Sequence, residues 1–131
     1  MARSLKASPA EACGCSCGCG ESQESAASAE AVKSELMNWP VQLKLVPPGA
    51  PYLKGADILL AADCTAFVVP DFHRRYLRNR PVLIACPKLE DTELQIVKLA
   101  EVIRTARPAA LTVLRMEVPC CGGLVRVAEE A

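Results

Sequence analysis

The chain has 131 residues, with 15 Lys and Arg against 15 Asp and Glu, and 51% of its residues are hydrophobic. This length suits one domain with its own core and is too short for two domains of ordinary size. The balanced charge does not predict a nucleic-acid surface, and no apolar run approaches the roughly 20 residues of a membrane helix. We therefore expect neither nucleic acid nor a membrane as a partner.

The sequence changes character near residue 35. Residues 1–35 are rich in Ala, Ser, Glu and Gly, which predicts a flexible tail ahead of a folded domain at 36–131. The first twelve residues lack the apolar stretch of a signal peptide. We therefore expect a cytoplasmic protein whose eight cysteines stay reduced, and clustered reduced cysteines favour metal binding or catalysis over disulfides.

Strand-like and helix-like segments alternate through the rest of the chain. Predicted strands occupy 41–46, 57–63, 81–86 and 111–118. Predicted helices occupy 30–38, 70–78, 92–107 and 124–130, and the third begins with a capping box from Thr92 to Gln95. This alternation predicts a three-layer α/β fold, a mostly parallel four-stranded sheet with helices on both faces, like a small Rossmann or flavodoxin-like domain. The direction of the first strand stays open, because its connection to the second is short for a parallel crossover.

Three of the predicted strands lead into cysteine. Cys64 follows the strand at 57–63, Cys86 ends the strand at 81–86, and the pair Cys120 and Cys121 follows the strand at 111–118. If the strands are parallel, these thiols meet at the carboxyl edge of one sheet, where open α/β folds bind their ligands. Neighbouring strands lie about 4.8 Å apart, so four thiols can converge without long loops. Four thiolates are the ligand set of an iron-sulfur cluster or of a closed zinc site, although a single cysteine is more often a small buried side chain.

The adjacent cysteines favour a cluster over a zinc ion, because neighbouring side chains diverge and suit two different irons. Gly122 and Gly123 follow them and let the backbone N–H groups of a helix N-terminus approach the sulfurs. Asp63 and Lys88 stand next to predicted ligands and are candidates for contacts around the cofactor. Solvent exposure or strand capping is the alternative for these two side chains.

A second group of thiols lies in the tail. Its members are Cys13, Cys15, Cys17 and Cys19, which alternate with glycine and serine. Side chains two positions apart in an extended backbone point the same way, so neighbouring members can bind one soft metal ion. A thiol-rich tail without metal is the alternative. If the tract binds metal, it predicts a module that delivers or senses a metal or a cluster.

Five short motifs occur together within residues 38–131. They are Trp39-Pro40-Val41-Gln42-Leu43, Ala61-Ala62-Asp63-Cys64, Asp71-Phe72-His73, Ala85-Cys86-Pro87-Lys88-Leu89 and Glu117-Val118-Pro119-Cys120-Cys121-Gly122-Gly123. In combination they resemble the C-terminal domain of ferredoxin-like iron-sulfur proteins of anaerobic prokaryotes, in which a twin-cluster ferredoxin module usually precedes this domain. Here the tract at 13–19 stands in place of that module. The resemblance implies a 4Fe-4S cluster, with zinc as the alternative, and electron transfer to or from a partner oxidoreductase.

A third interpretation is a thiol-dependent enzyme. Cys120 lies at the predicted N-terminus of the last helix, where a lowered pKa makes a cysteine a nucleophile. No candidate base is near it in the sequence, because the single histidine, His73, is distant. We therefore expect an electron carrier or a component of an oxidoreductase rather than a stand-alone enzyme.

Overall fold

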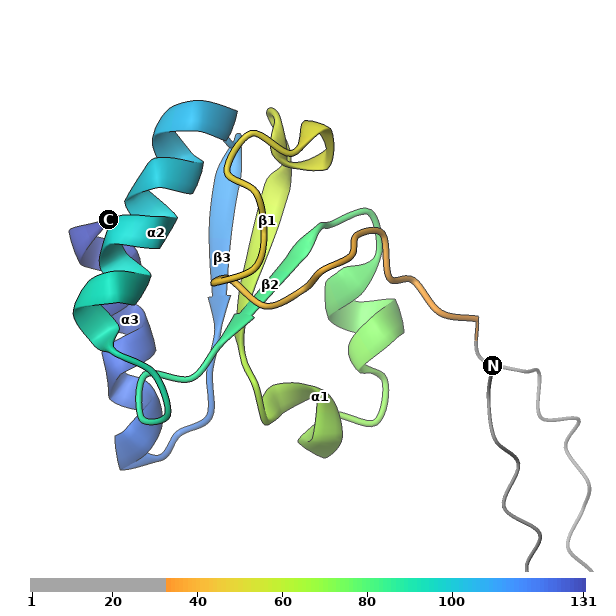
Figure 1. The fold of residues 1–131 in the computed structure, drawn as a ribbon. Coiled ribbons are helices and arrows are strands. Elements are labelled where there is room, and N and C mark those ends of the chain that lie inside the picture. The colour runs from red at the N-terminus through yellow and green to blue at the C-terminus, as the bar shows by residue number, and fades with distance from the viewer. Residues whose placement is uncertain (1–32) are drawn as a thin grey trace, which may run out of the picture. The chain divides into compact units, whose positions relative to one another are not determined.

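The computed structural model of the protein describes residues 33–131, so the cysteines at 13–19 lie outside the described residues. The sheet consists of β1 (Asp57–Ala62), β2 (Val82–Ala85) and β3 (Ala110–Leu114) in the order β2-β1-β3. The helices are α1 (Thr65–Val68), α2 (Thr92–Ala106) and α3 (Gly122–Glu130), with the short elements η1 (Pro51–Leu53), η2 (His73–Leu77) and η3 (Pro119–Cys121). All strand pairs are parallel (Figure 1), which confirms the expected α/β class.

β1 is the central strand and pairs with both neighbours. Leu60 lies opposite Leu83 of β2 and Val113 of β3. Every residue from Ile58 to Ala61 is completely buried. Because successive side chains of a strand point to opposite faces, β1 contributes to a core on each side of the sheet. Burial on both faces explains the almost wholly apolar sequence of this strand.

Each face of the sheet carries its own hydrophobic core. The core shared with α2 and α3 includes Ile58, Leu60, Leu83, Leu99, Val102, Leu124 and Val127. The core on the other face is formed by Leu59, Ala61, Phe72, Leu77 and Val82. Figure 1 shows α2 and α3 on one side of the sheet, and α1 with the helical segment that follows it on the other. The strands thus contact buried hydrophobic side chains on both faces of the sheet.

The segment 41–46, expected as a fourth strand, makes only a single parallel bridge to β2. The Leu43 N–H donates to the Ile84 carbonyl at 2.9 Å, and the Ile84 N–H donates to the Val41 carbonyl at 2.8 Å. The chain then turns, because the Leu45 N–H bonds back to the Gln42 carbonyl at 2.9 Å. The described residues therefore form a sheet of three strands, and the expected four strands are not confirmed. The bridge does show that this segment runs parallel to β2.

The residues just before this bridge are extended, although a helix was expected over 30–38. Within the described residues 33–38 no helix forms, and the side chain of Asn38 takes the place of a neighbouring strand. Its Nδ2 donates to the Val82 carbonyl at 3.0 Å, and its Oδ1 accepts from the Val82 N–H at 2.8 Å. These two bonds require an extended approach to the edge of β2, which a helix does not provide.

The helix expected at 70–78 is shorter and of another type. One turn, α1, follows β1 directly, and the Thr65 hydroxyl donates to the Ala62 carbonyl at 2.7 Å. Residues His73–Leu77 then form the π-helix η2. Phe72 and Leu77 are five positions apart and both enter the second core, which the wider i→i+5 turn permits. None of the helices within residues 33–131 has the length and apolar character needed to cross a membrane.

Candidate functional site

The carboxyl ends of the three strands lead to the four thiols of the folded domain. β1 ends at Ala62 and Cys64 begins the loop into α1, while β2 ends immediately before Cys86. After β3, residues 115–118 lead into η3, which contains Cys120 and Cys121. Because all three strands are parallel, these loops leave the sheet at the same edge (Figure 1). We call this part of the molecule the thiol edge.

Cys64 and Cys121 approach each other across the thiol edge. Partial desolvation raises the pKa of Cys64, and the neighbouring thiol of Cys121 raises it further, with a smaller effect from Cys120. These effects require that the start of α1 lies beside η3. Cys121 is 3% exposed and belongs to the core under α2 and α3, whereas Cys64 and Cys120 are exposed and Cys86 is half-buried. One thiol is therefore fixed by packing and two are open to solvent.

The loop after β2 also reaches η3 and α3. A Cβ atom placed on Gly123 would lie 2.8 Å from the Cβ of Pro87, so only glycine permits this approach of the backbone. A groove of about 420 Å³ opens beside the contact and is lined by Lys88 and Cys120 among others. Lys88, a predicted neighbour of the cofactor, is thus near an exposed thiol. Gly122, in contrast, has no atom within 4 Å of its Cβ position.

The sulfur atoms suit a soft metal or an iron-sulfur cluster in their chemistry, and their present arrangement is only partly convergent. Among residues 33–131, no three Cys, His, Asp or Glu side chains are already grouped so as to hold a metal ion. Cys64 and Cys121 form the closest association, and coordination by four thiols requires rearrangement of the others. The exposed side chains of Cys64 and Cys120 are free of the core packing that would oppose such a change.

Beside Asp63 lie the polar side chains of Gln42, Glu90 and Gln95, which sequence reasoning did not connect with the thiol edge. Burial raises the pKa of Asp63, the charge of Glu90 raises it further, and the neighbouring Gln42 side chain acts in the opposite direction. The Gln95 Nε2 donates to the Cys86 carbonyl at 3.1 Å and to Glu90 Oε2 at 3.0 Å. Asp63 is therefore surrounded by polar groups, and Gln95 ties α2 to the loop that carries Cys86.

His73 is occupied elsewhere. Its Nδ1 accepts a hydrogen bond from the Glu35 N–H at 3.2 Å, and its ring makes an edge contact with Phe72 at a centroid distance of 6.2 Å. Arg78 of the same region lies 3.7 Å from the Glu35 carboxylate. These contacts hold residue 35 against η2 and its surroundings.

Comparison with known proteins gives the class of the domain. The model of the Rossmann-like domain family matches residues 50–131, which contain all three strands and the thiol edge. The chain belongs to this Rossmann-like family. It is also similar to an uncharacterized protein of Archaeoglobus fulgidus, with 40% identity over 97 residues, which cover 74% of this chain and 68% of that protein. No solved structure gives a significant match.

Proposed function

We propose that the thiol edge is a cofactor site for an iron-sulfur cluster, of the 4Fe-4S type, held by Cys64, Cys86, Cys120 and Cys121. The observation that carries this proposal is that the thiol of Cys121 lies beside that of Cys64, although the two residues follow two different strands. Four soft sulfur donors at one edge of a parallel sheet are the ligand set that such clusters use. The protein would act in the cytoplasm and exchange electrons with a partner oxidoreductase.

The residues of the thiol edge would have different roles in such a site. Cys121 is buried and would anchor the cofactor to the core, whereas the exposed Cys64 and Cys120 leave one side open to a redox partner. The nine-residue helix α3 starts at Gly122, so its N-terminal N–H groups favour thiolate over thiol nearby. A cluster held there would supply a one-electron redox centre.

We also infer that the domain is a three-layer member of the Rossmann-like class to which the segment 41–46 adds a fourth, incomplete strand. A core on each face of the sheet supports the layering. The parallel bridge between Gln42 and Ile84 supports an extension of the sheet beyond β2. Hydrogen-exchange protection of the Leu43 amide, comparable to that of the amides of β2, is the expected result.

Anaerobic reconstitution with iron and sulfide tests the cofactor. We expect iron and acid-labile sulfide to bind in equal amounts, with a broad visible absorption that dithionite bleaches. Serine in place of each of the four thiols in turn should lower the bound iron. As the matched control, Cys13, Cys15, Cys17 and Cys19 are replaced together by serine, and the absorption of the folded domain should be unchanged. A colourless protein without iron after reconstitution would contradict the proposal, and zinc bound by the same four thiols would replace the cluster with the alternative metal.

A second candidate function is favoured by the groove beside Cys120. This exposed thiol lines the groove together with Lys88, so the edge also suits a thiol-dependent reaction. Fast alkylation of Cys120 at neutral pH, lost in Lys88→Met but kept in Lys54→Met, would favour this function. An alkylation rate equal to that of a free cysteine would remove it.

Delivery of a metal or a cluster is the remaining proposal and depends on the tract at 13–19. If this proposal is right, replacing the four tail cysteines abolishes transfer of the metal or cluster to an acceptor protein, while the metal of the folded domain stays in place. Loss of both together would instead make the tail part of the main site.

A further inference from the structure

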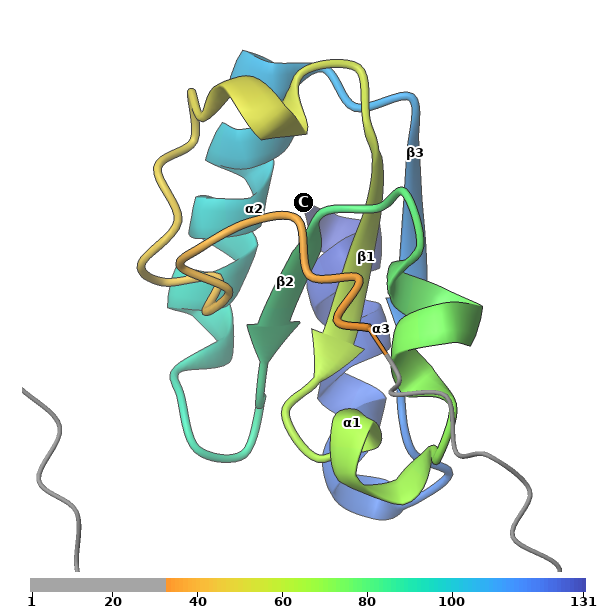
Figure 2. The same cartoon turned by 90° about the vertical axis from the view of Figure 1, so that its right-hand side faces the viewer.

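A second groove lies along α2, and the proposed function makes no use of it. Its volume is about 500 Å³, within the range of small-molecule sites, which is roughly 300–1,000 Å³. One wall is the exposed side of α2, with Leu94 and Lys98, and the loop after β2 contributes Leu89 and Glu90. Lys44 stands on the opposite wall, in the segment that precedes η1 and runs beside α2 in Figure 2.

Gln95 contributes an unpaired hydrogen-bond acceptor to the lining of this groove. The residue lines the groove, yet it is only 4% exposed. Its Nε2 is used by the Cys86 carbonyl and by Glu90, whereas its Oε1 has no hydrogen-bond partner among the described residues. A buried acceptor without a donor destabilises the folded state. If the Gln95 side chain turns this atom toward the groove, a ligand with an N–H donor supplies the missing partner.

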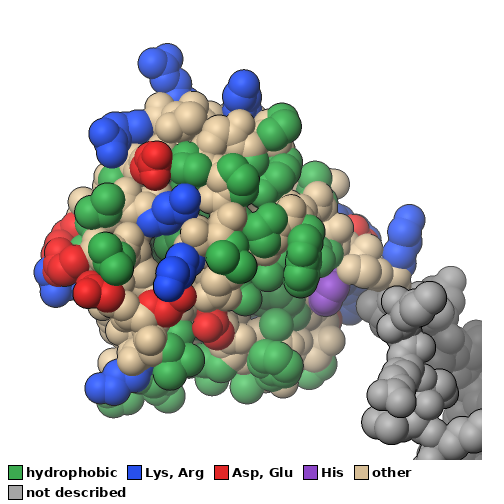
Figure 3. Space-filling model, in the orientation of Figure 1, with side chains coloured by type: hydrophobic (Ala, Val, Ile, Leu, Met, Phe, Trp, Pro, Cys, Tyr) green, Lys and Arg blue, Asp and Glu red, His purple; other side chains and the backbone are tan. Residues whose placement is uncertain are grey.

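The rest of the lining adds an apolar surface and two kinds of charge. Leu89, Leu94 and Val97 are 80%, 66% and 63% exposed, which is high for large aliphatic side chains on one groove. The Glu90 carboxylate is next to Gln95, and Asp91 and Glu101 add two further carboxylates to the lining. Neither Lys44 nor Lys98 forms an ion pair within residues 33–131. Figure 3 shows apolar, basic and acidic side chains close together over this part of the surface.

We propose that the α2 groove binds a small zwitterion with an aliphatic body, of the class of free aliphatic α-amino acids. The ammonium group donates to Gln95 Oε1 and to the Glu90 carboxylate. The carboxylate of the ligand is held by the two lysines, and its side chain covers the leucines. An N–H donor, a negative charge and an apolar group are thus each matched by a different part of the lining, independently of the thiol edge.

Titration of the full, ¹⁵N-labelled chain with leucine tests the proposal, with a thiol reductant present. We expect saturable amide shifts at Leu94, Gln95 and Lys98, with a millimolar or lower dissociation constant. Two probes lack one charge each: 4-methylpentanoate has no ammonium group and 3-methylbutylamine has no carboxylate. Each should bind at least about tenfold more weakly than leucine, since a hydrogen bond to a charged group contributes about that factor.

Two substitutions of half-buried side chains separate the two charges. Glu90→Gln should weaken the binding of leucine but leave the binding of 4-methylpentanoate unchanged. Lys98→Met should weaken the binding of leucine but leave that of 3-methylbutylamine unchanged. Lys54→Met, which lies outside the groove, is the control and should change none of the three. Absence of saturable shifts up to about 10 mM leucine, ten times a millimolar dissociation constant, would overturn the proposal. Equal binding of all three probes would overturn it as well, because it would mean non-specific apolar adsorption.

Discussion

Gly123 lies against Pro87, so that the first turn of α3 and the loop after β2 meet without an intervening side chain. A Cβ atom at position 123 would approach the Pro87 Cβ to 2.8 Å and its Cγ to 3.2 Å. Neither atom can move freely, because one belongs to a helix backbone and the other to a rigid ring. This contact sets the separation between the two chain segments that carry Cys86 and Cys121.

Gly123→Ala is therefore expected to destabilise the domain. The added methyl group must push α3 away from the loop, which costs about 1–3 kcal/mol, as in other over-packed sites. Urea unfolding at pH 7 measures the change. Gly122→Ala is the matched control: its Cβ position is open and its φ of −58° is helical, so stability should stay the same or rise slightly. Equal loss of stability in both variants would show that the Pro87 contact is not the cause.

Asn38→Ala should also destabilise the domain, since it removes both hydrogen bonds to Val82 and leaves a buried N–H and carbonyl unpaired. We expect a loss of about 1–3 kcal/mol in the free energy of unfolding. Met37→Ala changes an adjacent side chain that is 56% exposed and should stay within about 0.5 kcal/mol of the parent. Thermal unfolding of both variants measures the difference, and an unchanged midpoint for Asn38→Ala would show that water replaces the amide without cost.

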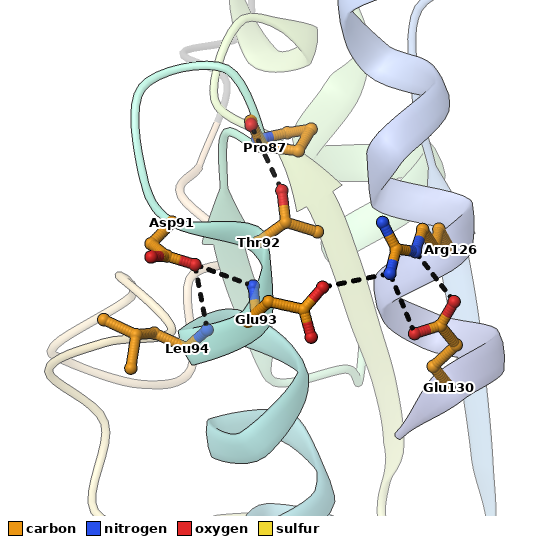
Figure 4. Close-up of polar contacts among 7 residues, drawn as sticks. All are labelled: Pro87, Asp91, Thr92, Glu93, Leu94, Arg126 and Glu130. Carbon is orange, nitrogen blue, oxygen red and sulfur yellow. Dashed lines mark hydrogen bonds and ion pairs between the residues drawn. The ribbon is translucent and has the colours of Figure 1, made fainter.

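The start of α2 gives a prediction about capping. The Asp91 Oδ1 accepts from the Glu93 N–H at 2.9 Å and from the Leu94 N–H at 3.4 Å (Figure 4). The Thr92 hydroxyl instead donates to the Pro87 carbonyl at 3.4 Å. Asp91→Ala should cost about 1 kcal/mol, as the loss of an N-cap does, and Thr92→Ala should cost less. The order of the two urea midpoints tests this, and the reverse order would restore Thr92 as the cap.

A pH-dependent prediction follows from α3. The Arg126 side chain donates to Glu130 at 2.7 Å and reaches Glu93 of α2 at 2.9 Å (Figure 4), and its hydrogen bond lowers the pKa of Glu130. A carboxyl whose pKa is lower in the folded state stabilises the folded protein. This contribution is complete at pH values above the pKa of Glu in the unfolded chain, which is about 4.3. That contribution is lost as the pH falls through the folded pKa.

Glu130→Gln should consequently lower stability at pH 7 and show less loss between pH 5 and pH 3 than the parent. Urea midpoints at pH 7, 5 and 3 measure this effect, which is small because the pair is exposed and decreases with added salt. Glu129→Gln removes the same charge from a neighbour that forms no ion pair within residues 33–131. The same pH profile in both variants would assign the effect to net charge alone.

Much of the fold could be predicted because the relevant signals are local and repeated. The apolar run of β1 and the helical stripe of α2 each span many residues, and the Rossmann-like class follows from their alternation. The segment 41–46 has the same alternating pattern as a strand. It forms only one bridge, because the backbone turns back to Gln42. The pattern does not show this turn, which depends on how the chain packs beside α2.

The candidate site was predicted at the level of strands and was incomplete at the level of side chains. The strand ends placed the four thiols at one edge, but the burial of Cys121 and the exposure of Cys64 depend on packing between distant segments. The sequence predicted a capping box from Thr92 to Gln95, but the structure has Asp91 as the N-cap, and Gln95 takes no part in capping. Its bond to the Cys86 carbonyl joins residues nine positions apart through a loop, and no sequence pattern reports that.

The amide of Asn38 and the bridge at Gln42 close one border of the sheet, while β3 forms the other border. Open borders of sheets invite strand addition by other molecules, which is how fibres grow. Within the described residues, β2 is already bonded on its outer side, whereas β3 has no further strand beside it. The same few hydrogen bonds that stabilise β2 thus leave β3 as the edge at which the sheet could accept a strand from another molecule.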